Sequence, residues 1–230
     1  MEDLKAWLLN NAEKISSVVD FNPAADRLYP FDFTVQNHEL TDDILGDTAV
    51  FSAWASNKLE VSGSRYGIGG YNEHRTIYTR SAHFDTEEEP RRLHLGVDIW
   101  GEAGTPVYNF YDGVIHSFRN NDQFGDYGAT IIMKYDLGGE VLHVLYGHLS
   151  LASIKGLQEG EFIAGGAQIA ALGNQQENGQ WPPHLHMQLI YDMEGKRGDY
   201  PGVCQLSKSA AYLENCPDPG LILRYTFGAA

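Results

Sequence analysis

The chain has 230 residues, which suffices for one large domain or for one domain with a sizeable extension. Hydrophobic residues make up 43% of the chain and charged residues 20%, a balance that favours a packed core over disorder. Sixteen basic residues against 31 acidic ones leave a formal net charge of −15. This charge argues against binding to nucleic acids or anionic membranes, since both partners require a clustered basic surface.

The N-terminal residues have the apolar spacing of an amphipathic helix. Apolar residues from Leu4 to Val19 recur at steps of three and four, which predicts a helix that Asn22-Pro23 ends. The segment lacks the unbroken apolar core of a secretory signal, and no stretch reaches the roughly 18 apolar residues of a membrane span. If Met1 is the natural start, we expect a cytoplasmic protein.

The rest of the chain is typical of a β protein. The irregular pattern over 28–85 predicts short strands and loops, whereas short β-rich runs alternate with glycine-containing turns from His94 to Tyr191. After them, KSAAYLENC at 208–216 predicts a short helix and LILRY at 221–225 a strand.

These patterns predict a mainly β fold, with an antiparallel sandwich or barrel-sandwich hybrid core, an N-terminal helix and a short C-terminal helix. We expect three parts: an N-terminal helix and irregular β extension over 1–90, a β domain over 91–192, and a C-terminal extension over 193–230. Cys204 and Cys216 are too few for a disulfide scaffold, and two reduced thiols are favoured over one bridge.

Three of the β-rich runs carry histidines in a pattern that suits metal chemistry. Strand side chains alternate between faces, so His184 and His186 in PPHLH share one face, and so do His94 and Asp98 in HLGVD. In YGHL, the same alternation predicts that His148 shares a face with Tyr146, Val144 and Leu142.

Imidazole nitrogen and carboxylate oxygen are ligands of zinc, and a catalytic zinc has three protein ligands with one open position. Five candidate groups exceed that number, so the surplus histidines would be free to transfer protons. Zinc would polarise a carbonyl group and acidify water, which is the chemistry that amide hydrolysis requires.

The segment from Leu93 to Tyr191 resembles the catalytic domain of the lysostaphin-type zinc metalloendopeptidases. The matching elements are HLGVD at 94–98, GTPV at 104–107, DGVI at 112–115, YGHL at 146–149, EGEFIAGGAQIAALGN at 159–174 and PPHLH at 182–186. The flanks, RYGIGGYNEHRTIY and YPGVCQLSKSAAYLENCPDPGLIL, resemble the peptidase-like module found between kinase-like phosphotransferase and aminotransferase domains in bacterial fusion proteins.

The resemblance implies one Zn²⁺ per chain, with His94, Asp98 and His186 as its ligands and His148 and His184 as the catalytic pair. It also implies that residues of the preceding segment line or support the cleft, and it makes three of them candidates for substrate or oxyanion contacts: Tyr71, Arg75 and Tyr78.

The sequence thus predicts a zinc-dependent endopeptidase that cleaves a peptide-like substrate, with peptidoglycan-derived peptides among the candidates. Two alternatives remain: a non-hydrolytic zinc-containing binding or regulatory module of the same fold, and a histidine phosphotransfer module. A phosphocarrier does not need Asp98, so the HxxxD pattern favours the metal site over phosphotransfer.

Overall fold

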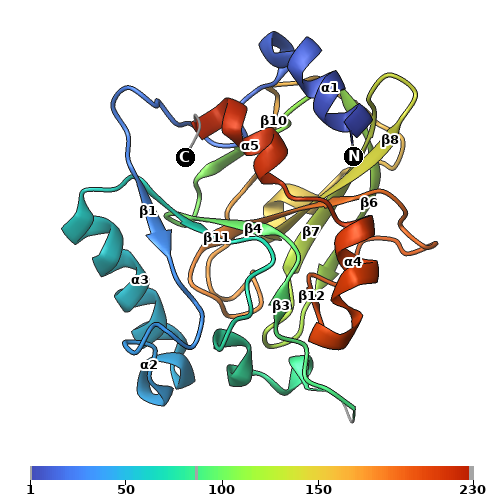
Figure 1. Cartoon of the computed structure of the whole chain (residues 1–230). Helices are drawn as coiled ribbons and strands as arrows, with labels where there is room; N and C mark the ends of the chain where they lie inside the picture. The colour runs from blue at the N-terminus through green and yellow to red at the C-terminus, as the bar shows by residue number, and fades with distance from the viewer. Residues whose placement is uncertain (1, 86–87, 228–230) are drawn as a thin grey trace.

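An eight-stranded sheet forms the centre of the computed structural model, which describes residues 2–85 and 88–227 (Figure 1). In spatial order its strands are β1 (Leu28–Phe31), β2 (Tyr66–Gly69), β4 (Val97–Trp100), β11 (His184–Ile190), β8 (Val141–Leu149), β7 (Gly128–Asp136), β6 (Gly113–Asn121) and β9 (Phe162–Ile163). Neighbouring strands are antiparallel except β1 and β2, which pair in parallel.

Two small antiparallel sheets accompany the large one. One pairs β5 (Pro106–Tyr108) with β10 (Gln168–Ala171), and the other pairs β3 (Leu93–His94) with β12 (Val203–Cys204). The helices are α1 (Glu2–Asn10), α2 (Asp42–Gly46), α3 (Thr48–Ser62), α4 (Ser209–Asn215) and α5 (Gly220–Phe227). Short 3-10 turns cover Ala12–Lys14, Ile77–Arg80, Ala82–Phe84, Leu151–Ile154 and Leu206–Lys208.

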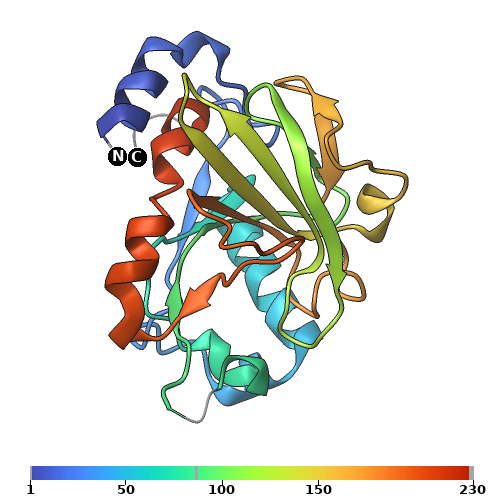
Figure 2. The same ribbon diagram turned by 90° about the vertical axis from the view of Figure 1, so that its right-hand side faces the viewer.

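The helices lie at the periphery of this β framework, which confirms the predicted mainly β fold with an N-terminal and a C-terminal helix. Figure 1 shows α3 beside β1, and Figure 2 shows α4 and α5, in red, along one side of the molecule. Every helix among the described residues is too short or too polar to span a bilayer.

The N-terminal helix is shorter than the apolar spacing predicts. It ends at Asn10, a 3-10 turn follows at Ala12–Lys14, and the chain then runs alongside the β5 region, where the Ser16 amide donates to the Phe110 carbonyl and the Tyr108 amide donates to the Val18 carbonyl. Val18 and Val19 are buried as expected, but in a bend outside any helix. Pairing with a neighbouring chain segment therefore outweighs the helical spacing.

Helix α3 corrects the prediction of strands and loops over 28–85. The Asp47 carboxylate accepts hydrogen bonds from the amides of Ala49 and Val50 at its start, and Gly63 ends it in the left-handed conformation at φ 64°. Its apolar residues form no single stripe, because Val50 and Val61 face solvent while Phe51 is buried. Only the two caps could have revealed this helix in the sequence.

Residues 221–225 form part of α5 rather than the predicted strand. A short apolar run does not distinguish a buried strand from a buried helix. Asp218 and Pro219 favour the helix here. The Asp218 carboxylate accepts a hydrogen bond from the Gly220 amide, and the Pro219 carbonyl accepts from the amides of Ile222 and Leu223. Helix α4 lies within the predicted 208–216, and both cysteines are free and buried.

We predict that Phe51→Ala lowers the free energy of unfolding by about 3–5 kcal/mol, because removing a fully buried ring leaves a cavity. The ring contacts Phe33, Trp100 and Trp181, with ring centroids 6.2 to 6.5 Å away. Chemical denaturation measures the change. Val50→Ala, on the same helix at a side chain that is 45% exposed, serves as the control and should change stability by about 0.5 kcal/mol or less.

Candidate functional site

Strand β11 presents alternate faces to the core and to the site, as the sequence predicts. Leu185, Met187 and Leu189 belong to the main hydrophobic cluster. His184 and His186 point the other way, into a pocket. The period-two pattern of this strand therefore places both histidines on one polar face.

The register of the central sheet brings the remaining ligand candidates to His186. Asp98 on β4 lies directly opposite His186 on β11, and His94 comes from β3, which pairs with β12 instead. The run HLGVD is therefore broken between two strands rather than continuously extended. Its ends still meet, since His94 Nε2 lies 3.3 Å from Asp98 Oδ1 and 3.0 Å from His186 Nδ1. The distance from His186 Nδ1 to Asp98 Oδ1 is 3.0 Å.

Outer hydrogen bonds determine which atoms of these three side chains face inward. His94 Nδ1 donates to the Gly70 carbonyl at 2.8 Å, and His186 Nε2 donates to Gln188 Oε1 at 3.0 Å. The Gln188 amide is oriented by its own donor group, which contacts the Pro201 carbonyl and Cys216 Sγ. The outer nitrogen of each imidazole is therefore the donor, and with one proton per ring the inner nitrogen carries a lone pair.

Two nitrogen lone pairs and one carboxylate oxygen consequently converge with no proton between them. Such an arrangement is repulsive unless a cation lies at its centre. The ligand atoms of His94, Asp98 and His186 all lie within 4.8 Å of one another, and all three side chains are buried. The donor set of two imidazoles and one carboxylate matches the preference of zinc, so the residues fit a catalytic zinc ion.

His148 reaches the site by a route that strand alternation does not predict. In the register of β8 with β11, Gly147 and Leu145 lie opposite His186 and Gln188, so regular alternation would turn His148 to the far face with Tyr146. A bulge in β8 intervenes, and His148 adopts a left-handed conformation with φ 62°. The expectation that His148 shares a face with Tyr146 is therefore wrong, although His148 does lie in the pocket.

His148 and His184 form a second pair beside the ligand cluster. Their ring centroids are 4.1 Å apart, and His184 also stacks on Trp100 at 4.1 Å. His148 Nδ1 donates to the Asn178 carbonyl at 2.8 Å, and His184 Nδ1 donates to the Pro182 carbonyl at 2.7 Å. In both neutral rings Nε2 therefore carries a lone pair that can accept a proton.

Burial and neighbouring charges set the protonation states of the ligand candidates His94 and Asp98 and of the pair His148 and His184. It lowers the pKa of both His94 and His184 to about 4, and it holds the pKa of His148 well below its ordinary value. Burial alone would raise the pKa of Asp98, but the neighbouring His94 and Arg75 hold it well below its usual range. At neutral pH these three imidazoles are neutral and the carboxylate is ionised, so His94 and Asp98 can bind a metal ion and His148 and His184 can accept a proton.

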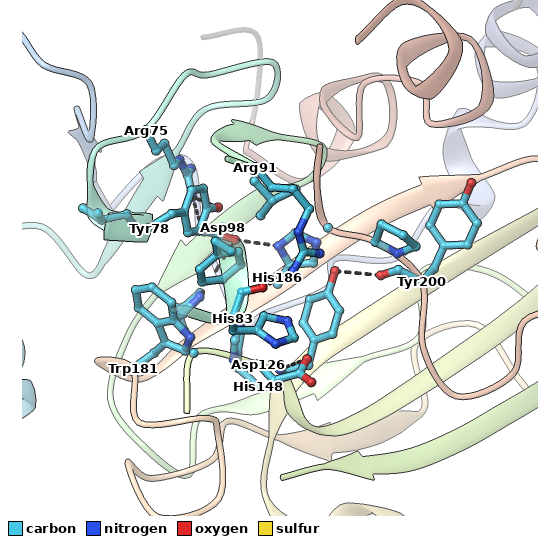
Figure 3. Close-up of a pocket in the computed structure, with 18 of the residues that line it drawn as sticks. Arg75, Tyr78, His83, Arg91, Asp98, Asp126, His148, Trp181, His186 and Tyr200 are labelled. Carbon is cyan, nitrogen blue, oxygen red and sulfur yellow. Dashed lines mark hydrogen bonds and ion pairs between the residues drawn. The ribbon is translucent and has the colours of Figure 1, made fainter. Parts of the chain in front are cut away.

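The pocket that contains these groups has a volume of about 120 Å³. Figure 3 shows Asp98 and His186 on one wall, with His148 and Trp181 beside them. Several lining residues were not foreseen from the sequence, among them Trp100, Tyr127, Trp181, His83, Arg91, Asp126 and Asp199. They come from separate segments without a shared motif. Gln188, by contrast, continues the alternation of His184 and His186 and could have been predicted.

The three residues predicted to contact the substrate or oxyanion, Tyr71, Arg75 and Tyr78, occupy different positions. Tyr78 and Arg75 line the pocket, with Arg75 Nη1 donating to the Tyr78 hydroxyl at 3.3 Å and to Asp98 Oδ2 at 2.5 Å. Burial raises the pKa of Tyr78, so its hydroxyl stays protonated. The Tyr71 hydroxyl instead donates to the Cys216 carbonyl at 2.6 Å, and Tyr71 is not among the pocket-lining residues.

Comparison with known proteins gives a family match over this region. Residues 92–198 match the family model described as peptidase family M23. The chain is 35% identical over 123 residues to the "DD-carboxypeptidase/endopeptidase Mpg" of Neisseria meningitidis serogroup B (strain ATCC 13091 / M2091), which covers 51% of this chain and 26% of that protein. It is 33% identical over 119 residues to the "Peptidoglycan DD-endopeptidase ShyA" of Vibrio cholerae, which covers 48% of this chain and 24% of that protein.

The chain therefore spans about a quarter of the length of these curated relatives. Among solved structures, the catalytic domain of the antimicrobial peptidase lysostaphin from Staphylococcus simulans is similar with a TM-score of 0.42 and 21% sequence identity, over 70% of this chain and 96% of that chain.

We predict that Gly96→Ala disturbs the ligand cluster, because an added Cβ would lie 2.6 Å from His186 Cε1 and 2.7 Å from the Met187 carbonyl oxygen. Relieving this overlap requires β11 to move, so the free energy of unfolding should fall by about 1–3 kcal/mol. Metal analysis of the purified variant should also find less bound zinc. Gly46→Ala is the control, since a Cβ there meets nothing within 4 Å. Normal zinc content in Gly96→Ala would contradict the prediction.

Proposed function

We propose that the chain, whose residues 92–198 match the model of peptidase family M23, is a zinc-dependent peptidase that hydrolyses a peptide bond with the help of two histidines. The observation that carries the proposal is the convergence of two lone pairs and one carboxylate oxygen beside a second pair of neutral histidines. The first set suits a metal ion, and the second suits proton transfer.

In this proposal one Zn²⁺ per chain is held by His94 Nε2, Asp98 Oδ1 and His186 Nδ1, the atoms that face inward. When bound, the ion supplies Lewis-acid chemistry, which polarises a substrate carbonyl and acidifies water. Gly70 and Gln188 keep the outer nitrogens of the two imidazoles protonated, so the inner nitrogens remain available as ligands.

His148 and His184 take the proton-transfer roles. Backbone carbonyls hold the Nδ1 protons of both rings, so either Nε2 can accept a proton from the attacking water and later donate it to the leaving amine. Stacking on Trp100 and the left-handed backbone at His148 restrict the two rings to positions beside the ligand cluster. Such preorganisation avoids the loss of entropy that two mobile side chains would suffer.

Tyr78 is the candidate for stabilising negative charge on the carbonyl oxygen. Its oxygen accepts a hydrogen bond from Arg75, which leaves its own proton free to donate to a substrate in the pocket. We assign no substrate contact to Tyr71, because its hydroxyl proton is used by the Cys216 carbonyl.

We propose a peptide substrate, with cross-linked peptides of peptidoglycan as the first candidate class. The names of the curated relatives support this choice. The net charge of −15 favours peptides that are neutral or cationic over anionic polymers.

Separate substitutions should divide the ligands from the proton-transfer residues. His94→Ala and Asp98→Ala should each lose the bound zinc, whereas His148→Ala and His184→Ala should retain about one zinc per chain and lose turnover by roughly 10² to 10⁴-fold. Metal analysis of protein purified without added metal, together with a cleavage assay, measures both effects. An absence of zinc in the unmodified protein would refute the metallopeptidase proposal, and loss of zinc in His148→Ala would refute the division of roles.

A peptide digest should define the bond that is cleaved. We expect cleavage of cross-linked muropeptides, abolished by a chelator and restored by added zinc, because the proposed chemistry needs the ion. Linear peptides of ordinary L-residues serve as the comparison, and mass spectrometry of the products identifies the bond. Cleavage that persists in the presence of chelator, or cleavage of the linear peptides alone, would contradict the metal requirement or the substrate class, respectively.

A further inference from the structure

Arg75 is a buried guanidinium that contacts the outer atoms of the ligand cluster. Its side chain is only 1% exposed, and Asp98 lies between it and His186 (Figure 3). Arg75 Nη1 donates to Asp98 Oδ2 at 2.5 Å, while Asp98 Oδ1 faces the two imidazoles. The two oxygens of one carboxylate are thus divided between a protein cation and the ligand cluster.

The same guanidinium also contacts the group that orients His94. Arg75 Nη2 donates to the Gly70 carbonyl at 3.2 Å, and that carbonyl is also the acceptor for His94 Nδ1. One side chain is therefore linked to two of the three ligand candidates through their outer atoms.

Arg75 is itself held in place from several sides. Its Nε donates to Glu73 Oε2 at 2.6 Å, and its planar group lies over the Phe33 ring at 5.1 Å. Its backbone amide donates to the Arg92 carbonyl, next to β3, and the His94 amide donates to the Glu73 carbonyl. These backbone contacts join the loop that carries Arg75 directly to the strand that carries His94.

We propose that Arg75 is a positioning residue that restricts Asp98 to binding the metal ion through Oδ1 alone and keeps His94 in its ligating orientation. The inference rests on the proposed zinc site and deepens it. A carboxylate with an unengaged second oxygen can rotate or bind an ion through both oxygens, whereas a guanidinium on Oδ2 prevents both. The guanidinium also balances a carboxylate charge that would be costly to bury alone.

The first test is the zinc affinity of Arg75→Met, measured by competition with a chromophoric chelator on the whole chain. We expect the affinity to fall about 10- to 100-fold, the loss typical when a group that orients a metal ligand is removed. The visible spectrum of the Co²⁺-loaded protein should change as well, since its bands depend on ligand geometry, and a fold that is merely less stable would not change them.

Arg75→Lys is the second variant. It keeps a positive charge beside Asp98 and Glu73, so it can still be tested if Arg75→Met fails to fold. An ammonium group cannot contact Asp98, Glu73 and Gly70 at once as the guanidinium does. We expect zinc affinity between those of Arg75→Met and the unmodified protein, with a shifted Co²⁺ spectrum.

Arg80→Met is the matched control. Arg80 is a partly buried arginine of the neighbouring 3-10 turn that packs on Trp181 and donates to Thr48, and within the described part of the chain it makes no hydrogen bond or ion pair with His94, Asp98 or His186. This variant should keep the zinc affinity and Co²⁺ spectrum of the unmodified protein.

Arg75→Lys with unchanged zinc affinity and unchanged Co²⁺ spectrum would overturn the inference, as would an equal loss of affinity in Arg80→Met. A different result would refute the proposed function itself: the unmodified protein would bind no zinc, or His94→Ala would bind zinc equally well.

Discussion

The divided Asp98 carboxylate is the interaction on which the site depends. One oxygen faces two imidazole nitrogens and the other accepts from Arg75, whose guanidinium balances the buried negative charge. Without a cation on either side, a carboxylate this deeply buried would tend to take up a proton and lose its value as a ligand. The register of β4 with β11 places Asp98 opposite His186, so the pairing of these two strands determines which side chains meet at the site.

The segment that precedes the family match is part of this arrangement. Gly70, Arg75 and Tyr78 all lie before residue 92, yet they orient His94, hold Asp98 and line the pocket. Behind them, α3 places Phe51 against Trp100, on which His184 stacks. The matched region therefore supplies the ligand and proton-transfer candidates, while the preceding segment supplies the groups that restrict their geometry.

The left-handed backbone at His148 places a second histidine pair beside this site. A non-glycine residue in the left-handed region costs about 1–3 kcal/mol, which persists only where the surroundings enforce it. At His148 the enforcing contacts are the hydrogen bonds of its amide to Tyr127 and of its ring to Asn178.

The sequence by itself determined the β class and the faces of His184 and His186, because alternation along a strand is a local property of the backbone. It also identified His94 and Asp98 as partners, although the strand between them is broken. Only the tertiary structure decided the rest. The face of His148 depends on a bulge in β8, helix α3 has no apolar stripe, and the contact of Arg75 with Asp98 joins segments that no local pattern relates. Each of these depends on which segments pack together, and residue spacing along one strand or helix carries no such information.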